Sequence, residues 1–295
     1  MKPLAELAAA ISHAPLSPER GGYTLTMREC AGAEEAAAVL EQEAEALGGE
    51  GARLHLGWGS FRNLDLAAAR RSAAVLLLDV NLHQHRVWDA VRDALAGAAD
   101  ARAFIEQVVP RLPREPRLRQ FADDTRGWLR GDLERRGSWL CEARPERFRH
   151  VRALFAAGEV SVGSLDLRGG SKGAARFERL AHALEALRAQ TGLALDTLYI
   201  SNLPWYLAQP QGFFGERHQP LLERPKASPL ENVYTHLGHL APLARWIVSA
   251  MRLRRDATPD NLQWLTETLG AEEFLASEAW TALGLPAKNL KKTRG

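Results

Sequence analysis

Cysteine is scarce in this chain: the 295 residues include two, Cys30 and Cys141. Neither has a second cysteine or a histidine at metal-ligand spacing, which argues against a disulfide framework or a cysteine-bound metal. Long apolar runs are missing too, because no stretch approaches the roughly 20 apolar residues that a membrane-spanning helix needs. Glu6 interrupts the first apolar stretch, so no secretory signal is expected. We therefore expect a cytoplasmic protein without a membrane partner.

An excess of one charge is also lacking. The formal net charge is +2 at pH 7, which offers no general argument for nucleic acid or an acidic membrane surface. Arginines and aromatic residues alternate only diffusely between Arg245 and Arg255, a weak signal for nucleic acid. The sequence has no Walker A loop and no Gly-x-Ser-x-Gly nucleophile elbow. His236 and His239 share a predicted helical face, but nothing completes a ligand set, so we expect no metal.

What is present is an alternation of strand-like and helix-like segments. Residues 52–56 and the nearly continuous apolar run 73–80 indicate strands, and residues 61–70 indicate a helix between them. An apolar run without alternation is typical of a parallel strand covered on both faces. Further strands are predicted at 159–167 and 195–200, so we expect an α/β fold: a Rossmann-like, mostly parallel sheet with helices on both faces.

The domain organisation follows from these elements. Residues 1–50 form an N-terminal helical segment, including a helix over 31–47, and residues 51–207 form the Rossmann-like core, with a helix over 174–190. A helical insertion occupies about 83–157. Residues 208–295 complete the same domain as a loop at 208–230 and helices at 231–254 and 259–282. Within the insertion, Arg and Glu are dense from Arg111 to Arg149; a solvated helical surface is the simpler explanation, and a basic cap over an anion pocket is the alternative.

The first candidate site is the turn Gly57-Trp58-Gly59, followed by Asn63, between the first core strand and its helix. Glycine lets the backbone approach a ligand closely, and the helix that follows offers free N–H groups and the positive end of its dipole. The third glycine of the dinucleotide fingerprint is missing, and a simple tight turn is the alternative.

Acidic residues follow two other strands. Asp79 ends the apolar strand, where a carboxylate can accept both hydroxyls of a ribose; capping of the next helix is the alternative. Asp166 ends a later strand, where it could bind an adenine amino group or belong to a turn. A fourth strand ends in the run from Ser201 to Tyr206. Its polar and aromatic groups could hold a planar amine, although burial in the core is the commoner fate of such aromatics.

The run Leu56-Gly57-Trp58-Gly59-Ser60-Phe61-Arg62-Asn63, with Val75–Val80, resembles class I S-adenosylmethionine-dependent methyltransferases. More narrowly, residues from about 50 to 207 resemble an uncharacterised bacterial family with a methyltransferase-like Rossmann fold. The pattern of that family is matched here by Asp166-Leu167 and Tyr199-Ile200-Ser201-Asn202.

This resemblance implies S-adenosylmethionine as a small-molecule cofactor and a methyl acceptor of unknown identity. Gly57 and Gly59 would approach the methionine part of the cofactor, Asp79 would hold its ribose, and Asp166 would lie near its adenine. Asn63 and Ser201 complete the cofactor-binding candidates, and Asn202 and Tyr206 are the candidates for orienting the acceptor.

Two departures from the pattern keep other functions open. The third loop glycine is absent, and Asn-Leu-Pro-Trp-Tyr replaces the Asn-Pro-Pro-Tyr type motif of amino-methyltransferases. The alternative is a non-catalytic protein on the same fold that binds a nucleotide or a partner protein. An NAD-dependent dehydrogenase is less favoured for two reasons. The third glycine is missing, and the sequence shows no obvious set of residues for hydride transfer.

Overall fold

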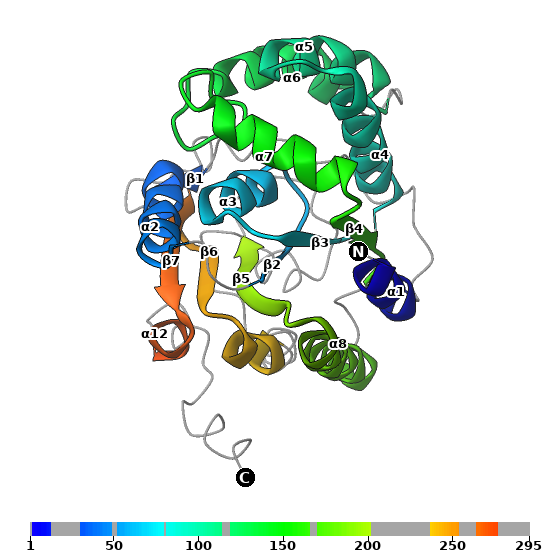
Figure 1. The fold of residues 1–295 in the computed structure, drawn as a ribbon, viewed down its shortest axis with the longest axis vertical. Coiled ribbons are helices and arrows are strands. Elements are labelled where there is room, and N and C mark those ends of the chain that lie inside the picture. The colour runs from blue at the N-terminus through cyan, green and yellow to red at the C-terminus, as the bar shows by residue number, and fades with distance from the viewer. Residues whose placement is uncertain are drawn as a thin grey trace.

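A single twisted sheet organises the chain (Figure 1). The computed structural model describes residues 2–12, 30–48, 52–79, 81–113, 119–165, 170–201, 237–253 and 264–276. The described strands form a seven-stranded sheet in the order β1-β7-β6-β5-β2-β3-β4. They are β1 (Cys30–Ala31), β2 (Arg53–Trp58), β3 (Ala74–Leu78), β4 (Val160–Gly163), β5 (Ala194–Ser201), β6 (Trp246–Leu253) and β7 (Trp264–Gly270). Neighbouring strands from β6 to β4 are parallel, whereas β7 is antiparallel to β6.

Helices cover both faces of this sheet, as the fold class predicted (Figure 1). One face carries α1 (Lys2–Ile11), α8 (Gly170–Thr191) and α12 (Ala271–Ala276). The other face carries α2 (Ala33–Ala46), α3 (Arg62–Arg70) and the helical insertion, which consists of α4 (Leu82–Gly97), α5 (Ala101–Val108), α6 (Arg119–Asp132) and α7 (Pro145–Ala156). A Rossmann-like α/β fold with a helical insertion is therefore confirmed.

Strand β3 shows why the apolar run forms a central strand. Its even-numbered residues from Ala74 to Leu78 pack into the core beneath α1 and α8, whereas Val75 and Leu77 pack against α4 and α7. All five residues are buried. A strand covered on both faces has no solvent side on which polar residues could alternate, so its sequence is continuously apolar.

Helix α3 is buried along its whole length. It lies between β2 and β5 on its inner side and α2 and α7 on its outer side (Figure 1). Its four polar or charged residues are therefore enclosed, and each needs a partner within the protein. They are Arg62, Asn63, Asp65 and Arg70.

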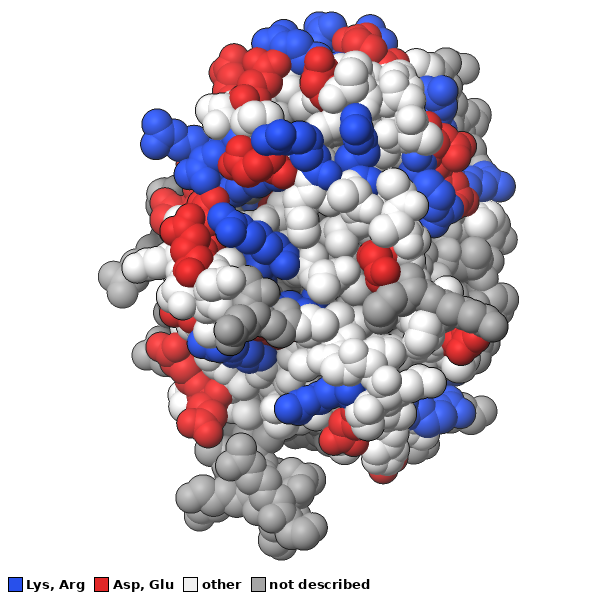
Figure 2. Space-filling model, in the orientation of Figure 1, with Lys and Arg blue, Asp and Glu red and all other residues white. Residues whose placement is uncertain are grey.

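The helical insertion has a surface of mixed charge. Figure 2 shows Lys and Arg interspersed with Asp and Glu over this part of the molecule. Arg102 pairs with Glu142, and both Arg126 and Arg130 pair with Glu106, all on exposed side chains. These contacts fit a solvated, ion-paired helical surface, which was the simpler of the two explanations for the charge run.

The helices predicted at 231–254 and 259–282 are wrong in large part. Residues 246–253 form β6 and residues 264–270 form β7, and only α12 and a short helical stretch at 237–243 remain helical among the described residues. The run Trp246-Ile247-Val248 is apolar and short, so periodicity alone does not separate strand from helix. Its branched residues favour the strand, which is completed by pairing with β5.

No helix within the described ranges combines the length and apolar composition that crossing a bilayer requires.

Candidate functional site

The sheet reverses its strand order between β2 and β5. From β2 the chain proceeds to β3 and β4 on one side, and it later returns to place β5 and β6 on the other side. Open α/β sheets bind ligands beyond the carboxyl ends of their strands at such a switch point. The candidate site is therefore the edge where β2, β3 and β5 end.

Gly59 and Asp79 are neighbours at this edge. The last residues of β2 and β3, Trp58 and Leu78, are register partners, and Gly59 and Asp79 follow them directly. The Asp79 amide donates a hydrogen bond of 3.0 Å to the Gly163 carbonyl at the end of β4, so its backbone continues the ladder. Its side chain is half-buried. A loop glycine and a carboxylate thus lie side by side at this edge of the sheet, which we also call the rim.

The two glycines of the loop have different environments. Gly57 is buried, and a Cβ added there would overlap with Asn63 Oδ1 and lie 2.9 Å from the Tyr199 Cβ. Gly59 has φ +77°, and a Cβ added there would meet no described atom within 4 Å. Gly57 is therefore needed for internal packing, whereas the space beside Gly59 is open among the described residues, so a ligand could approach the backbone there.

Asn63 holds the loop from the first turn of α3. Its Nδ2 donates to the carbonyls of Trp58 and Ser60, at 3.0 and 2.9 Å. Its Oδ1 lies 3.0 Å from His55 Nε2. The side chain has no exposed surface, and all three contacts are with protein groups. Its predicted role as a direct cofactor ligand stays a prediction, but its described contacts are those of a loop anchor.

His55 lies beneath this anchor on β2, and no sequence motif assigns it a role. Burial lowers the pKa of His55 to about 4, outweighing the hydrogen bond with Asn63 and the charge of Asp196, which both raise it. The imidazole is therefore neutral at physiological pH. Because Asn63 Oδ1 can only accept, His55 Nε2 carries the proton.

The first turn of α4 contacts both parts of the rim. Gln84 Nε2 donates to the Gly59 carbonyl at 3.2 Å, and His85 Nε2 lies 2.8 Å from the Asp79 carbonyl. Asp79 Oδ1 accepts from the Asn81 amide at 2.8 Å. The N-cap of α4 is Asn81, whose side chain accepts from the His83 amide, so the capping role considered for Asp79 belongs to Asn81.

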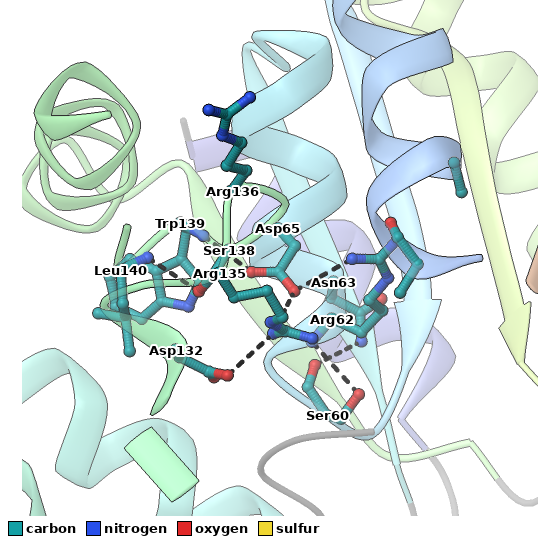
Figure 3. Close-up of polar contacts among 12 residues, drawn as sticks. Ser60, Arg62, Asn63, Asp65, Asp132, Arg135, Arg136, Ser138, Trp139 and Leu140 are labelled. Carbon is teal, nitrogen blue, oxygen red and sulfur yellow. Dashed lines mark hydrogen bonds and ion pairs between the residues drawn. The ribbon is translucent and has the colours of Figure 1, made fainter. Parts of the chain in front are cut away.

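A buried carboxylate ties the start of α3 to the helical insertion (Figure 3). Asp65 Oδ2 lies 3.3 Å from both Arg62 Nη1 and Arg135 Nη2, and Oδ1 accepts from the Trp139 amide at 2.8 Å. The Asp65 side chain is 2% exposed. Arg135 also pairs with Asp132 at 3.2 Å. The insertion therefore holds the first turn of α3, which directly follows the glycine loop, in place.

Three predicted site residues lie outside the described residues: Asp166, Asn202 and Tyr206. Ser201 is the last residue of β5 and pairs with Ser249 of β6, which places its backbone at the candidate edge. Within the described ranges, no group of three or more His, Cys, Asp or Glu side chains is arranged to hold a metal ion.

Sequence reasoning missed two residues that support this edge: His55 beneath the loop and Gln84 beside it. A signal for His55 does exist in the sequence. Side chains two positions apart on a strand point to the same face, so His55 shares a face with Gly57, and that face meets the helix carrying Asn63. Gln84 carries no comparable signal, because its contact with Gly59 depends on where α4 packs.

Comparisons with models of known protein families and with curated protein sequences give no match to this chain.

Proposed function

We propose that this protein binds S-adenosylmethionine at the carboxyl edge of its sheet and acts as a methyltransferase-like enzyme. The observation that carries the proposal is the adjacency of Gly59 and Asp79 at the ends of paired strands, where no described atom fills the space beside Gly59. A loop glycine beside a carboxylate on the next strand is the arrangement that adenosyl-containing cofactors require for their ribose and linker.

The sheet order supports this proposal. Counted from β2, the parallel strands run 3-2-1-4-5, which is the doubly wound order with the crevice between the first and fourth strands. The antiparallel β7 follows beside the fifth strand. Order alone does not determine activity, so the proposal rests on the rim residues as well.

The residues present fit such a cofactor. Gly59 leaves the backbone accessible, and the Asp79 carboxylate can accept hydrogen bonds from two ribose hydroxyls. When bound, S-adenosylmethionine supplies an electrophilic methyl group on its sulfonium. The contribution of the chain is mainly to hold and orient the reactants and to exclude water. Asn202 and Tyr206 are proposed to orient the acceptor; both lie outside the described residues.

The first test is thermal unfolding of the full chain with S-adenosylmethionine, S-adenosylhomocysteine or NAD. A ligand that binds the folded state raises the unfolding temperature. We expect the two sulfur-containing adenosyl ligands to raise it and NAD to leave it unchanged. A shift with NAD alone would favour a dehydrogenase, and no shift with any ligand would favour a non-catalytic protein that binds a partner.

The second test is Asp79→Asn, measured by calorimetric titration of S-adenosylhomocysteine. The amide keeps an oxygen for the Asn81 amide but loses the charge that strengthens hydrogen bonds to ribose. We expect the dissociation constant to rise about tenfold or more. Asp89→Asn is the matched control, because Asp89 is an exposed residue of α4 that pairs with Arg92 one turn away. Equal affinity of Asp79→Asn and wild type would refute the ribose role.

A further inference from the structure

We propose that His55 is a positioning residue for the ligand loop: it holds the Asn63 amide, and Asn63 in turn sets the orientation of the peptide groups from Trp58 to Ser60. This inference rests on the proposed function for its ligand, but the loop geometry can be tested without one. It gives Asn63 an indirect role in binding and adds a buried histidine that touches no part of the rim itself.

The hydrogen bonds fix the peptide planes of the loop. The carbonyls of Trp58 and Ser60 both point toward Asn63 Nδ2. In a trans peptide the N–H points opposite to the carbonyl of the preceding residue. The N–H groups of Gly59 and Phe61 therefore point away from Asn63. Gln84 fixes the intervening peptide through the Gly59 carbonyl at 3.2 Å.

Asn63 can do this only while its amide has one orientation. Rotation by half a turn would place Oδ1 against the two carbonyls and remove the side-chain donor from each, so that Ser60 would keep only the Asn63 backbone amide at 3.1 Å. The N–H at His55 Nε2, 3.0 Å from Asn63 Oδ1, stabilises the orientation seen here. Since Asn63 has no exposed surface, water does not reach its oxygen to replace the histidine.

The local sequence is built around this pair. Gly57 leaves the space that the Asn63 amide occupies, because any Cβ at that position would overlap with Oδ1. His55 Nδ1 is buried and has no hydrogen-bond partner among the described residues. A leucine at this position would bury no polar atom without a partner. Core packing alone therefore does not explain the histidine. Its contact with Asn63 is the interaction that explains it.

The experiment compares His55→Leu with His55→Gln. Leucine removes the donor and keeps an apolar side chain, whereas the glutamine amide can donate from a similar position. We expect His55→Leu to weaken S-adenosylhomocysteine binding at least tenfold in calorimetric titration and His55→Gln to recover most of the affinity. His150→Leu is the matched control, because His150 contacts the Ser72 carbonyl at the opposite end of β3 and should leave the affinity unchanged.

A second readout separates this inference from the proposed function. If wild type binds no adenosyl ligand, the proposed function fails, but amide hydrogen exchange still reports the loop. We expect the amides of Asn63 and Leu64, which donate to the Ser60 and Phe61 carbonyls at 3.1 and 2.8 Å, to exchange at least tenfold faster in His55→Leu, while Leu54 and Leu56 of β2 keep their wild-type rates. If His55→Leu does not fold, Asn63→Asp, which cannot donate to the two carbonyls, takes its place. Unchanged loop exchange together with lower global stability would overturn the inference.

Discussion

Arg70 and Asp196 form a buried, bidentate ion pair between residues 126 positions apart in the sequence. Arg70 Nε lies 2.6 Å from Oδ2, and Nη2 lies 2.9 Å from Oδ1. The Arg70 side chain has no exposed surface, and that of Asp196 is 9% exposed. The pair joins the end of α3 to the beginning of β5. It therefore holds α3 against β5 at the amino edge of the sheet, opposite the candidate site.

Asp196→Asn is expected to destabilise the protein strongly. It removes the counter-charge of Arg70 and leaves a guanidinium enclosed, which typically costs about 3–5 kcal/mol. The free energy of unfolding in urea measures the effect. Asp89→Asn, which breaks the exposed pair with Arg92, should change that free energy by less than about 1 kcal/mol. A loss below about 1 kcal/mol in Asp196→Asn would mean that water solvates Arg70 in the folded state.

The two loop glycines are expected to respond differently to alanine. Gly57→Ala places a Cβ on the fixed Asn63 amide and should cost about 3 kcal/mol, because neither neighbour can move away freely. Gly59→Ala meets no described atom within 4 Å, so we expect the strain of its positive φ to dominate, roughly 1–2 kcal/mol. Urea unfolding of both variants tests this order.

Gly158→Ala is the control for these variants. Gly158 also has positive φ (+69°) and open space, but it follows α7, away from the glycine loop. It should match Gly59→Ala in stability and leave ligand affinity unchanged. Similar stability losses at Gly57 and Gly59 would show that Asn63 yields easily, which would contradict its role as a rigid anchor.

The part of the fold that sequence reasoning predicts best is the unit from β2 to β3. Its strands and helix are adjacent in the chain and carry distinct periodicities, so local pattern suffices. The segments β6 and β7 were predicted as helices because their strand state depends on pairing with each other and with β5, which residues 246–253 alone do not reveal.

The candidate site shows the same division between local and non-local information. Gly59 and Asp79 are recognisable because each follows its own strand. The roles of Gly57 and Asn63 are not, since a glycine that approaches a ligand and one that makes room for a buried amide look identical in sequence. The Arg135–Asp65 contact spans 70 positions and is visible only in the folded chain.

Asp65→Asn is expected to loosen the helical insertion from α3. The amide can still accept from the Trp139 N–H, but its Nδ2 would face the guanidinium groups of Arg62 and Arg135. We expect a loss of about 3 kcal/mol in urea unfolding and faster proteolysis between α6 and α7. Glu106→Gln, which removes an exposed partner of Arg126 and Arg130, should have neither effect. Slower or unchanged cleavage in Asp65→Asn would show that Asp65 does not hold the helical insertion against α3.

The pH dependence of stability should carry the signature of His55. Its pKa in the folded protein is about 4, below the ordinary 6.5, so the unfolded chain binds more protons between these values. The free energy of unfolding should therefore fall as the pH falls from 6.5 to about 4, and the contribution of His55 amounts to about 3 kcal/mol. His55→Gln removes this contribution, so its free energy of unfolding should decline less steeply than that of wild type.

Burial also lowers the pKa of His150, so the comparison is between wild type and each single variant, with His150→Gln as a parallel series. Identical pH curves for wild type and His55→Gln would show that the folded imidazole titrates normally and that water reaches it.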